Sequence, residues 1–180
     1  MDLNAFWVLI EASSAEGSDR DVRREWLAAA LAGLPPSEVV EFAVRLDELR
    51  RRVDTWALWQ AAAVIHGGSC GTDSFFYFQP WLVGLGRVVF EEVAVDPDAL
   101  AEVPEVRVLA ACGGMHAWSS AQWPEWEGLG YVAAEVVGEG ALPPGLLSDP
   151  APAGVPWDFA DPAEIAARVP RLGSLFGEVA

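Results

Sequence analysis

The chain has 180 residues, of which 52% are hydrophobic and 21% are charged, and its formal net charge is −16. This length suits one hydrophobic core rather than two, and the composition is that of a globular chain and not of a disordered one. The charge comes from 27 acids against 11 arginines, with no lysine, and it argues against a nucleic-acid partner, because phosphate backbones are bound through clustered cations.

The sequence also argues against a membrane protein. No apolar run is long enough to cross a bilayer, and the first residues carry acids where a secretion signal needs positive charge. We therefore expect a cytoplasmic protein with no membrane partner. In that compartment Cys70 and Cys112 are expected to be reduced thiols rather than a disulfide.

Helical periodicity dominates the first third of the chain. Apolar residues recur with helical spacing over residues 3–13, and similar patterns predict helices over about 21–33 and 35–52. A fourth helix is expected to start at Asp54 as its N-cap and to stop at Gly67, because glycine often ends a helix in the left-handed conformation.

The middle of the chain is its most apolar part. As a helix, residues from about 73 to 92 would be apolar on almost every face, which predicts a buried central helix. Pro80 lies within this helix and is expected to kink it or to mark its start, because proline removes a backbone donor. Residues 106–112 form a second apolar run, which fits a strand or a helix equally well.

The last third alternates loops and helices. Residues 113–127 are loop-like, a helix resumes after them, and five prolines over about 140–157 predict an extended crossing segment. A last helix is expected from about Asp161. Together these elements predict an all-α or mainly α fold, arranged as a single-domain irregular helical bundle over residues 1–180.

Several stretches of the chain resemble a known bacterial family. They are FWVLIE near the start, LWQAAAVIHGGSCGTDSFFYFQPWLVGLGRVVFE in the middle, DPDAL after it, and GVPWDF and VPRLGSLF near the end. Through them the chain resembles the domain of unknown function 4240 family over nearly its whole length. The resemblance implies a largely helical fold and no established reaction.

The chain departs from the family pattern in this middle block. The family commonly has a Ser-Asp-Asp run and a Phe-Arg dipeptide, whereas this chain has Gly71, Thr72 and Asp73 and then Phe78 and Gln79. If the family has a carboxylate and guanidinium site there, this chain has lost one acid and the arginine that would answer it.

The two histidines and two cysteines form mirrored pairs. His66 precedes Cys70 in IHGGSCG, and Cys112 precedes His116 in ACGGMH, with two glycines inside each pair. Zinc binds four such ligands in a tetrahedron, so a structural zinc site is one hypothesis. The spacing matches no strong zinc signature, and the alternative is a histidine at a helix end with Cys70 packed as a small hydrophobe.

A cleft near Asp73, Trp81 and Arg87 is a further hypothesis, for a small-molecule binder or an enzyme. Asp73 lies beside glycines and an apolar helix, although helix capping is the commoner role of such an aspartate. Trp123 joins this candidate binding set, because it lies with two other tryptophans in a polar loop that either folds back as a lid or forms a contact surface.

No pattern typical of a nucleotide-binding loop, a hydrolase nucleophile or a zinc protease is present in the sequence. We therefore assign no catalytic residue, cofactor or metal. The favoured hypothesis is a non-catalytic acidic interaction protein, such as an immunity or regulatory factor, that engages a basic protein partner. The cleft and the zinc site stay open as alternatives.

Overall fold

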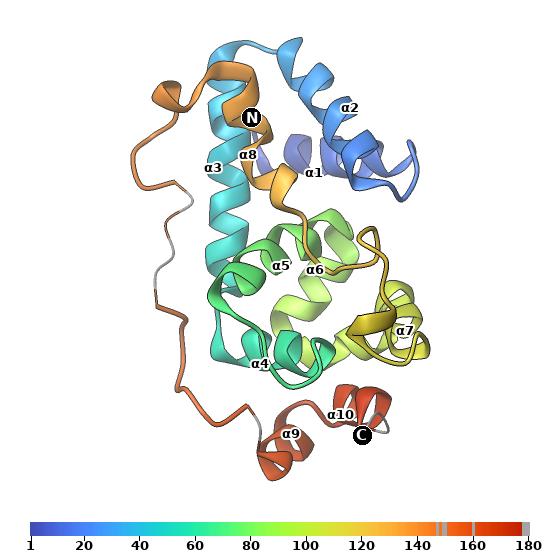
Figure 1. The fold of residues 1–180 in the computed structure, drawn as a ribbon. Coiled ribbons are helices and arrows are strands. Elements are labelled where there is room, and N and C mark those ends of the chain that lie inside the picture. The colour runs from blue at the N-terminus through green and yellow to red at the C-terminus, as the bar shows by residue number, and fades with distance from the viewer. Residues whose placement is uncertain (147, 149–150, 160, 178–180) are drawn as a thin grey trace. The chain divides into compact units, whose positions relative to one another are not determined.

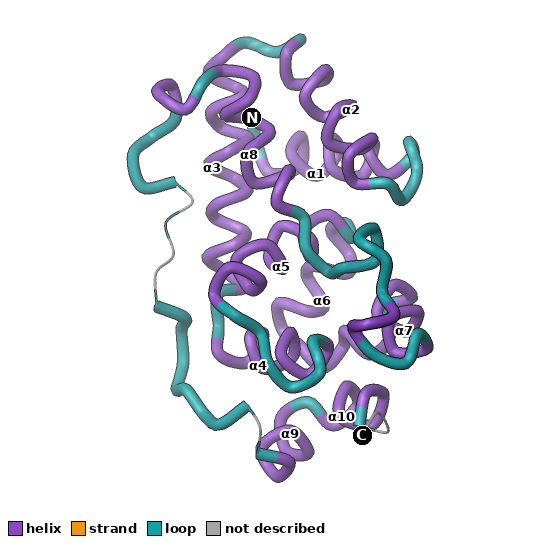
Figure 2. The backbone as a smooth tube through the Cα atoms, viewed as in Figure 1, coloured by secondary structure: helices purple, strands orange, loops and turns teal. Residues whose placement is uncertain are grey.

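The structure is a computed structural model that describes residues 1–146, 148, 151–159 and 161–177. Over these residues it consists of helices and loops, and its β pairing is an isolated bridge between Thr55 and Ala153 (Figure 2). The prediction of an all-α fold is confirmed. Among the described helices, none is both long enough and apolar enough to cross a membrane.

The helices are numbered in chain order (Figure 1). Their bounds are α1 Leu3–Ser14, α2 Arg20–Ala32, α3 Pro36–Val53, α4 Trp56–Ile65, α5 Thr72–Gly84, α6 Arg87–Val95, α7 Pro104–Ala111, α8 Glu127–Val137, α9 Pro162–Arg168 and α10 Pro170–Phe176. Short 3-10 helices lie between them, namely η1 Pro97–Glu102, η2 Met115–Ala117 and η3 Glu139–Ala141.

Side-chain caps explain where several helices begin. Backbone N–H groups in the first turns of α1, α2 and α9 donate to the carboxylates of Asp2, Asp19 and Asp161. Helix α4 begins one residue later than Asp54 predicts, because the hydroxyl of Thr55 accepts from the N–H of Leu58 at 3.1 Å. Gly67 follows the end of α4 with φ of 68°, as the sequence predicts.

The single helix predicted over about 73–92 is wrong, because this segment forms two helices. Helix α5 ends at Gly84 and α6 begins at Arg87. Gly86 between them has φ of 98°, a value that a right-handed helix does not allow. Helix α5 continues through Pro80. The later part of α5 is buried, as predicted, but Val88 at the start of α6 is 79% exposed and the segment is not one rod.

Two other expectations are resolved further along the chain. The apolar run over residues 106–112, which left strand and helix open, lies mostly in α7. The last helix, expected from about Asp161, is the pair α9 and α10. Val169 between them has φ −136° and ψ 57°, because the following Pro170 disfavours the helical conformation before it.

The proline-rich crossing segment predicted over about 140–157 is only partly described. Apart from the end of η3, its described residues form turns and loops with no helix. Residues 147, 149 and 150 of this segment lie outside the described residues. The extended crossing itself stays a prediction.

Contacts divide the chain into two compact units. Each unit is made of three segments. Unit 1 consists of Met1–Arg52, Phe76–Arg87 and Pro124–Pro150. Unit 2 consists of Val53–Phe75, Val88–Trp123 and Ala151–Ala180. The segments of one unit alternate with those of the other along the chain. The prediction of a single domain stays a prediction.

Unit 1 packs α1, α2, α3 and α8 with the later part of α5. The Phe6 ring lies in its core, 4.8 Å from the Phe42 ring between centroids. Helix α8 contacts α2, and its start is held by the N–H of Trp126, which donates to the Tyr77 carbonyl at 2.9 Å. A Cβ at Gly84 would come within 2.5 Å of the Trp126 ring, so this contact requires glycine.

A buried arginine ties the helices of unit 1 together. Arg23 of α2 is 8% exposed and donates to the carbonyls of Ile10 and Gly84 at 3.4 and 2.9 Å. Its guanidinium also lies over the Trp126 ring, 4.6 Å from the centroid. The cation therefore satisfies the last carbonyl of α5 and lies near the C-terminal end of α1, where the helix dipole favours positive charge.

Unit 2 is built around α4, which contacts η1, α7, α9 and α10. Its aromatic side chains form a ladder in which the Trp59 ring lies between those of Trp56 and Phe75. The centroids are 5.2 and 4.8 Å apart, and both pairs are within 6° of parallel. The Phe159 ring packs against Trp56 at 5.9 Å. The indole N–H of Trp59 donates to the Cys70 carbonyl at 2.8 Å, which fixes the loop after α4.

Gly86→Ala should lower the free energy of unfolding by about 1 kcal/mol or more, because φ of 98° is strained for any residue with a Cβ. The same substitution at Gly130, where an added Cβ inside α8 meets nothing within 4 Å, should instead stabilise by up to about 1 kcal/mol. Urea unfolding followed by circular dichroism measures both variants. Effects of equal sign would contradict this explanation.

The Tyr77 hydroxyl should resist ionisation in the folded protein. Burial raises the pKa of Tyr77, and the hydrogen bond that it donates to Glu127 at 3.0 Å raises it further. Because the folded pKa lies above the unfolded value of about 10, this contribution to stability is complete below about pH 10 and is lost as the pH rises beyond it.

The measurement compares the wild type with Tyr77→Phe. The phenolate absorbance of the folded protein at about pH 10 to 11 should be nearly the same in both. The free energy of unfolding should fall more steeply with pH in the wild type than in the variant. A clearly smaller absorbance rise in the variant would show that Tyr77 ionises normally.

Candidate functional site

The residues of the predicted cleft lie in different surroundings. Asp73 is exposed in the first turn of α5. Trp81 is 4% exposed, and its ring centroid lies 5.0 Å from that of Phe78. Arg87 is exposed at the start of α6 and donates to the side-chain oxygen of Asn4 at 2.9 Å. Trp81 is thus a core residue, and Arg87 makes a surface hydrogen bond to Asn4 of α1 within unit 1. The cleft itself stays a prediction.

Trp123 belongs to a small aromatic cluster in unit 2. Its ring centroid lies 5.9 Å from that of His66 and 5.4 Å from that of Trp118, which stands edge-on to it. Trp118 is buried, and its indole N–H donates to the Leu109 carbonyl at 3.1 Å. These loop rings fold back onto the protein, as the first of the two alternatives predicts. A binding role for Trp123 stays a prediction.

The structure does not gather the four histidine and cysteine side chains. The Nδ1 atom of His66, a buried residue, lies 2.7 Å from the Ala62 carbonyl oxygen. The Cys112 sulfur accepts from a glutamine side chain, and His116 is exposed. Over the described ranges, no three His, Cys, Asp or Glu side chains are placed to hold a metal ion. The zinc hypothesis built on these residues and Cys70 is therefore wrong.

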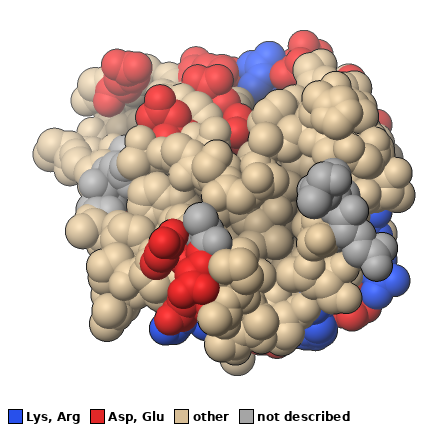
Figure 3. Space-filling view, turned by 60° about the horizontal axis from the view of Figure 1, so that its bottom comes forward, with Lys and Arg blue, Asp and Glu red and all other residues tan. Residues whose placement is uncertain are grey.

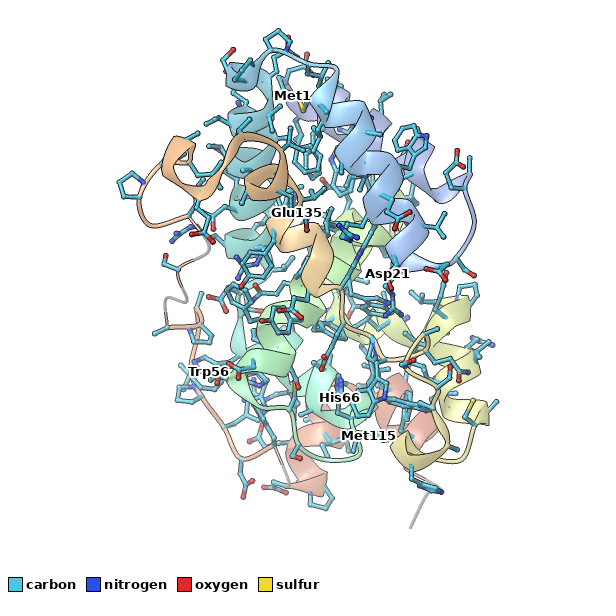
Figure 4. The ribbon with its side chains drawn as sticks, turned by 45° about the horizontal axis from the view of Figure 1, so that its top comes forward. Met1, Asp21, Trp56, His66, Met115 and Glu135 are labelled. Atoms are coloured by element: carbon cyan, nitrogen blue, oxygen red, sulfur yellow. The ribbon has the colours of Figure 1, made fainter. Side chains whose placement is uncertain are left out.

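The mirrored motifs instead bring their glycines together. Gly67, Gly68 and Gly114 line one cavity of about 220 Å³ in unit 2, between the loop after α4, the start of η2, and the pair α9 and α10. Met115, which follows the second glycine pair, also lines it and is labelled in Figure 4 together with His66. The other side chains that line the cavity are those of Val64, Ile65, Ile165 and Phe176.

A second feature of unit 2 is the surface that holds residues 151–159 and 161–177, which we call the docking segment. The segment is first held by its backbone. Ala153 donates its N–H to the Asp54 carbonyl at 2.8 Å and accepts from the N–H of Trp56 at 3.1 Å. This exchange is the isolated β bridge of the fold, and it fixes the segment beside the start of α4.

The carboxylate of Asp98 in η1 anchors the docking segment a second time. Asp98 is 4% exposed, and it accepts from the N–H of Leu172 at 2.9 Å and from the N–H and Nε of Arg171, both at 3.0 Å. Val169 provides no side-chain cap for α10, so Asp98 caps this helix from another element. Asp96 also accepts from Arg171, at 2.5 Å. The hydrogen bond to Asp98 raises the pKa of Arg171.

Several arginines are buried or form ion pairs with acids of the same chain, whereas other acids face solvent. Helix α2 shows the arrangement most clearly, because Arg23 is buried and Arg24 pairs with Glu135 at 2.7 Å, whereas Asp21 and Glu25 of the same helix are exposed. Asp21 and Glu135 are labelled in Figure 4. Further arginines that pair with acids of their own chain are Arg45, Arg51, Arg107 and Arg168. On the face drawn in Figure 3, acidic atoms form patches on a largely uncharged surface.

The chain belongs to the family described as Protein of unknown function (DUF4240), whose model matches residues 1–137. No curated protein and no solved structure matches the chain. The family resemblance seen in the sequence is confirmed, but the match is shorter than expected, since GVPWDF and VPRLGSLF lie beyond it. The docking segment is therefore outside the match, whereas Asp54, Trp56 and Asp98, which hold it, are inside.

Sequence reasoning missed both features of unit 2. Nothing local distinguishes Asp98 from the other 26 acids, because its partners lie more than 70 residues away along the chain. The repeated glycine pair is the one sequence pattern that points to the cavity. The histidines and cysteines beside those glycines drew attention to metal chemistry instead.

Asp98→Asn should loosen the docking segment more than Asp96→Asn does. Both substitutions remove one charge near Arg171, but Asp98 is buried and also binds backbone N–H groups. Charge-assisted hydrogen bonds of this kind contribute about 1.5–3 kcal/mol, so amide hydrogen exchange in α10 should speed up about tenfold or more in the Asp98 variant. Mass spectrometry measures the exchange, and equal rates in the two variants would contradict the anchoring role.

Proposed function

We propose that this chain is a non-catalytic protein-interaction domain that binds a basic helical segment of a partner protein. The binding surface is the part of unit 2 that holds the docking segment. The observation that carries the proposal is the position of Asp98, a buried carboxylate inside the family match. It binds the start of a helix, and the arginine beside it, from outside that match.

The contacts of the docking segment indicate which side chains a partner segment must have to bind the same surface. Val169 and Leu172 are 2% and 0% exposed, so the surface accepts two apolar side chains three residues apart. Arg171 lies between them in the sequence and reaches Asp96 and Asp98. A partner segment with an apolar residue just before its helix, arginine two residues later and leucine three residues later would reproduce these contacts. Binding a helix by its apolar face in a groove is a common mode of recognition.

The charge of the chain supports the same class of partner. Because arginines pair within the chain while acids such as Asp21 and Glu25 face solvent, the long-range field attracts cations and repels phosphates. The proposal therefore takes a basic protein as partner and no nucleic acid. It places the chain in the cytoplasm, with acidic regulatory or immunity proteins as the nearest functional class.

In this proposal the surface is self-occupied. A segment tethered to its own binding surface competes at an effective concentration on the order of millimolar, so a free partner of moderate affinity displaces only part of it. Weakening the docking segment without changing the surface should therefore raise the apparent affinity for a partner peptide. Arg171→Glu does this, because it places a carboxylate against Asp96 and Asp98.

The test uses the full chain and a fluorescein-labelled peptide with the sequence of residues 161–177. Fluorescence anisotropy at low salt should show binding to the Arg171→Glu chain with a Kd at least about tenfold below that of the wild type, the size of effect that one charged contact carries. Arg45→Glu on α3 is the matched control, since it reverses a charge in unit 1, and it should behave as the wild type does. Circular dichroism checks that each variant is folded.

Two further binding experiments test whether the contact between Asp98 and the arginine is required for binding. A peptide with glutamate in place of the residue corresponding to Arg171 should not bind, and the double variant Arg171→Glu with Asp98→Asn should lose affinity for the original peptide. Binding of the substituted peptide, or equal affinity of the wild type and the Arg171→Glu chain, would overturn the proposal.

A further inference from the structure

We propose that the cavity between the two Gly-Gly motifs is a binding site for a small uncharged apolar molecule, of about the size of one substituted aromatic ring. This inference goes beyond the interaction function, since it concerns a different site in unit 2 and a different class of ligand. It stands on how the cavity is formed, what lines it and how large it is.

The cavity exists because the backbone requires glycine in its wall. Gly67 and Gly68 lie just after α4, with φ of 68° and 106°, and Gly114 lies just before η2, with φ of 112°. Residues with a Cβ adopt these values only under strain, so side chains are missing where the two loops face each other. The N–H groups of the first two glycines donate to carbonyls of α4, at 3.1 and 2.8 Å, and these bonds hold the wall in place.

The lining selects an uncharged apolar ligand. Around the glycines the wall consists of aliphatic, thioether and phenyl groups from Val64, Ile65, Met115, Ile165 and Phe176, and no charged residue is among the described residues that line it. A charged group that entered would lose part of its hydration without gaining an opposite charge. An apolar group gains dispersion contacts, and the polarizable sulfur of methionine packs well against aromatic rings.

The volume sets the size of the ligand. An apolar cavity of about 150 Å³ in another protein stays dry and binds benzene. The cavity between the glycine loops has about 220 Å³, which is room for a ring with one or two further groups, and it opens to solvent beside the exposed Gly67 and Gly68. It is smaller than the usual range for drug-sized ligands, which starts at about 300 Å³.

Occupancy of the cavity would also affect the docking segment. Ile165 and Phe176 belong to that segment, whereas Gly67, Gly68 and Met115 belong to the family-matched part. A ligand that touches both sides adds contacts only when the segment is docked, so it favours the docked state. The ligand would thus oppose partner binding if the interaction proposal is correct, but the site itself does not depend on that proposal.

The test reads the cavity wall directly. The chain has two methionines, Met1 and Met115, so protein labelled with carbon-13 at the methionine methyl groups gives one signal from the wall and one internal control. Titration with toluene should shift the Met115 signal in a saturable way, with a Kd of about 1 mM or tighter, and leave the Met1 signal unchanged. Benzylamine, whose ammonium group is charged at neutral pH, should shift neither signal.

Two phenylalanine substitutions localise the binding. Phe176→Trp places a larger ring in the cavity wall and should weaken toluene binding about tenfold or more. Phe159→Trp makes the same exchange elsewhere in the docking segment and should leave the affinity within about twofold of the wild type. Circular dichroism checks the fold of both, and the wild-type titration decides the proposal alone if Phe176→Trp does not fold.

The absence of a saturable Met115 shift with toluene, an equal response to benzylamine, or an unchanged affinity in a folded Phe176→Trp variant would overturn the proposal. The readout involves no partner peptide. Failure of the cavity proposal therefore leaves the interaction proposal standing, and failure of the peptide test leaves the Met115 titration valid.

Discussion

The contact between the Asp98 carboxylate and the first turn of α10 is the interaction on which much of unit 2 depends. A helix as short as Pro170–Phe176 is marginal by itself, because nucleation costs more than so few hydrogen bonds return. A buried carboxylate is costly too, unless its lone pairs are used. The N–H groups of α10 satisfy the buried carboxylate of Asp98, and the carboxylate in turn caps the short helix. The same helix places Phe176 in the cavity wall and buries Leu172, so this contact supports both positions.

Glycine backbone sets the second constraint, and it acts in both units. At Gly86 a positive φ divides an apolar segment into α5 and α6, and at Gly67, Gly68 and Gly114 it leaves loops without side chains around a shared space. At Gly84 glycine is required for a different reason, because the Trp126 ring approaches too closely for a Cβ. The same residue type thus ends helices, lines a cavity and admits an indole, and only its surroundings tell these roles apart.

Sequence reasoning succeeded where the cause is local. Helical spacing of apolar residues predicted the all-α class, and Gly67 marked the end of α4. It failed where the cause lies far along the chain or in one backbone angle. Neither the role of Asp98, whose partners are in α10, nor the break at Gly86 can be read from hydrophobic periodicity. The reading of His66 and Cys112 as zinc ligands failed because sequence spacing alone does not determine which side chains converge.

The alternation of the two units along the chain has a consequence for how the protein forms. Unit 2 needs Ala153 beside Asp54 and Arg171 beside Asp98, and unit 1 needs α8 beside α2, so neither unit is complete until late stretches of the polypeptide are available. Closing such long loops is slow compared with pairing neighbouring helices. During synthesis on the ribosome, the aromatic ladder around Trp59 therefore lacks its Phe159 partner while about one hundred further residues are added, and exposed rings of this kind are what chaperones protect.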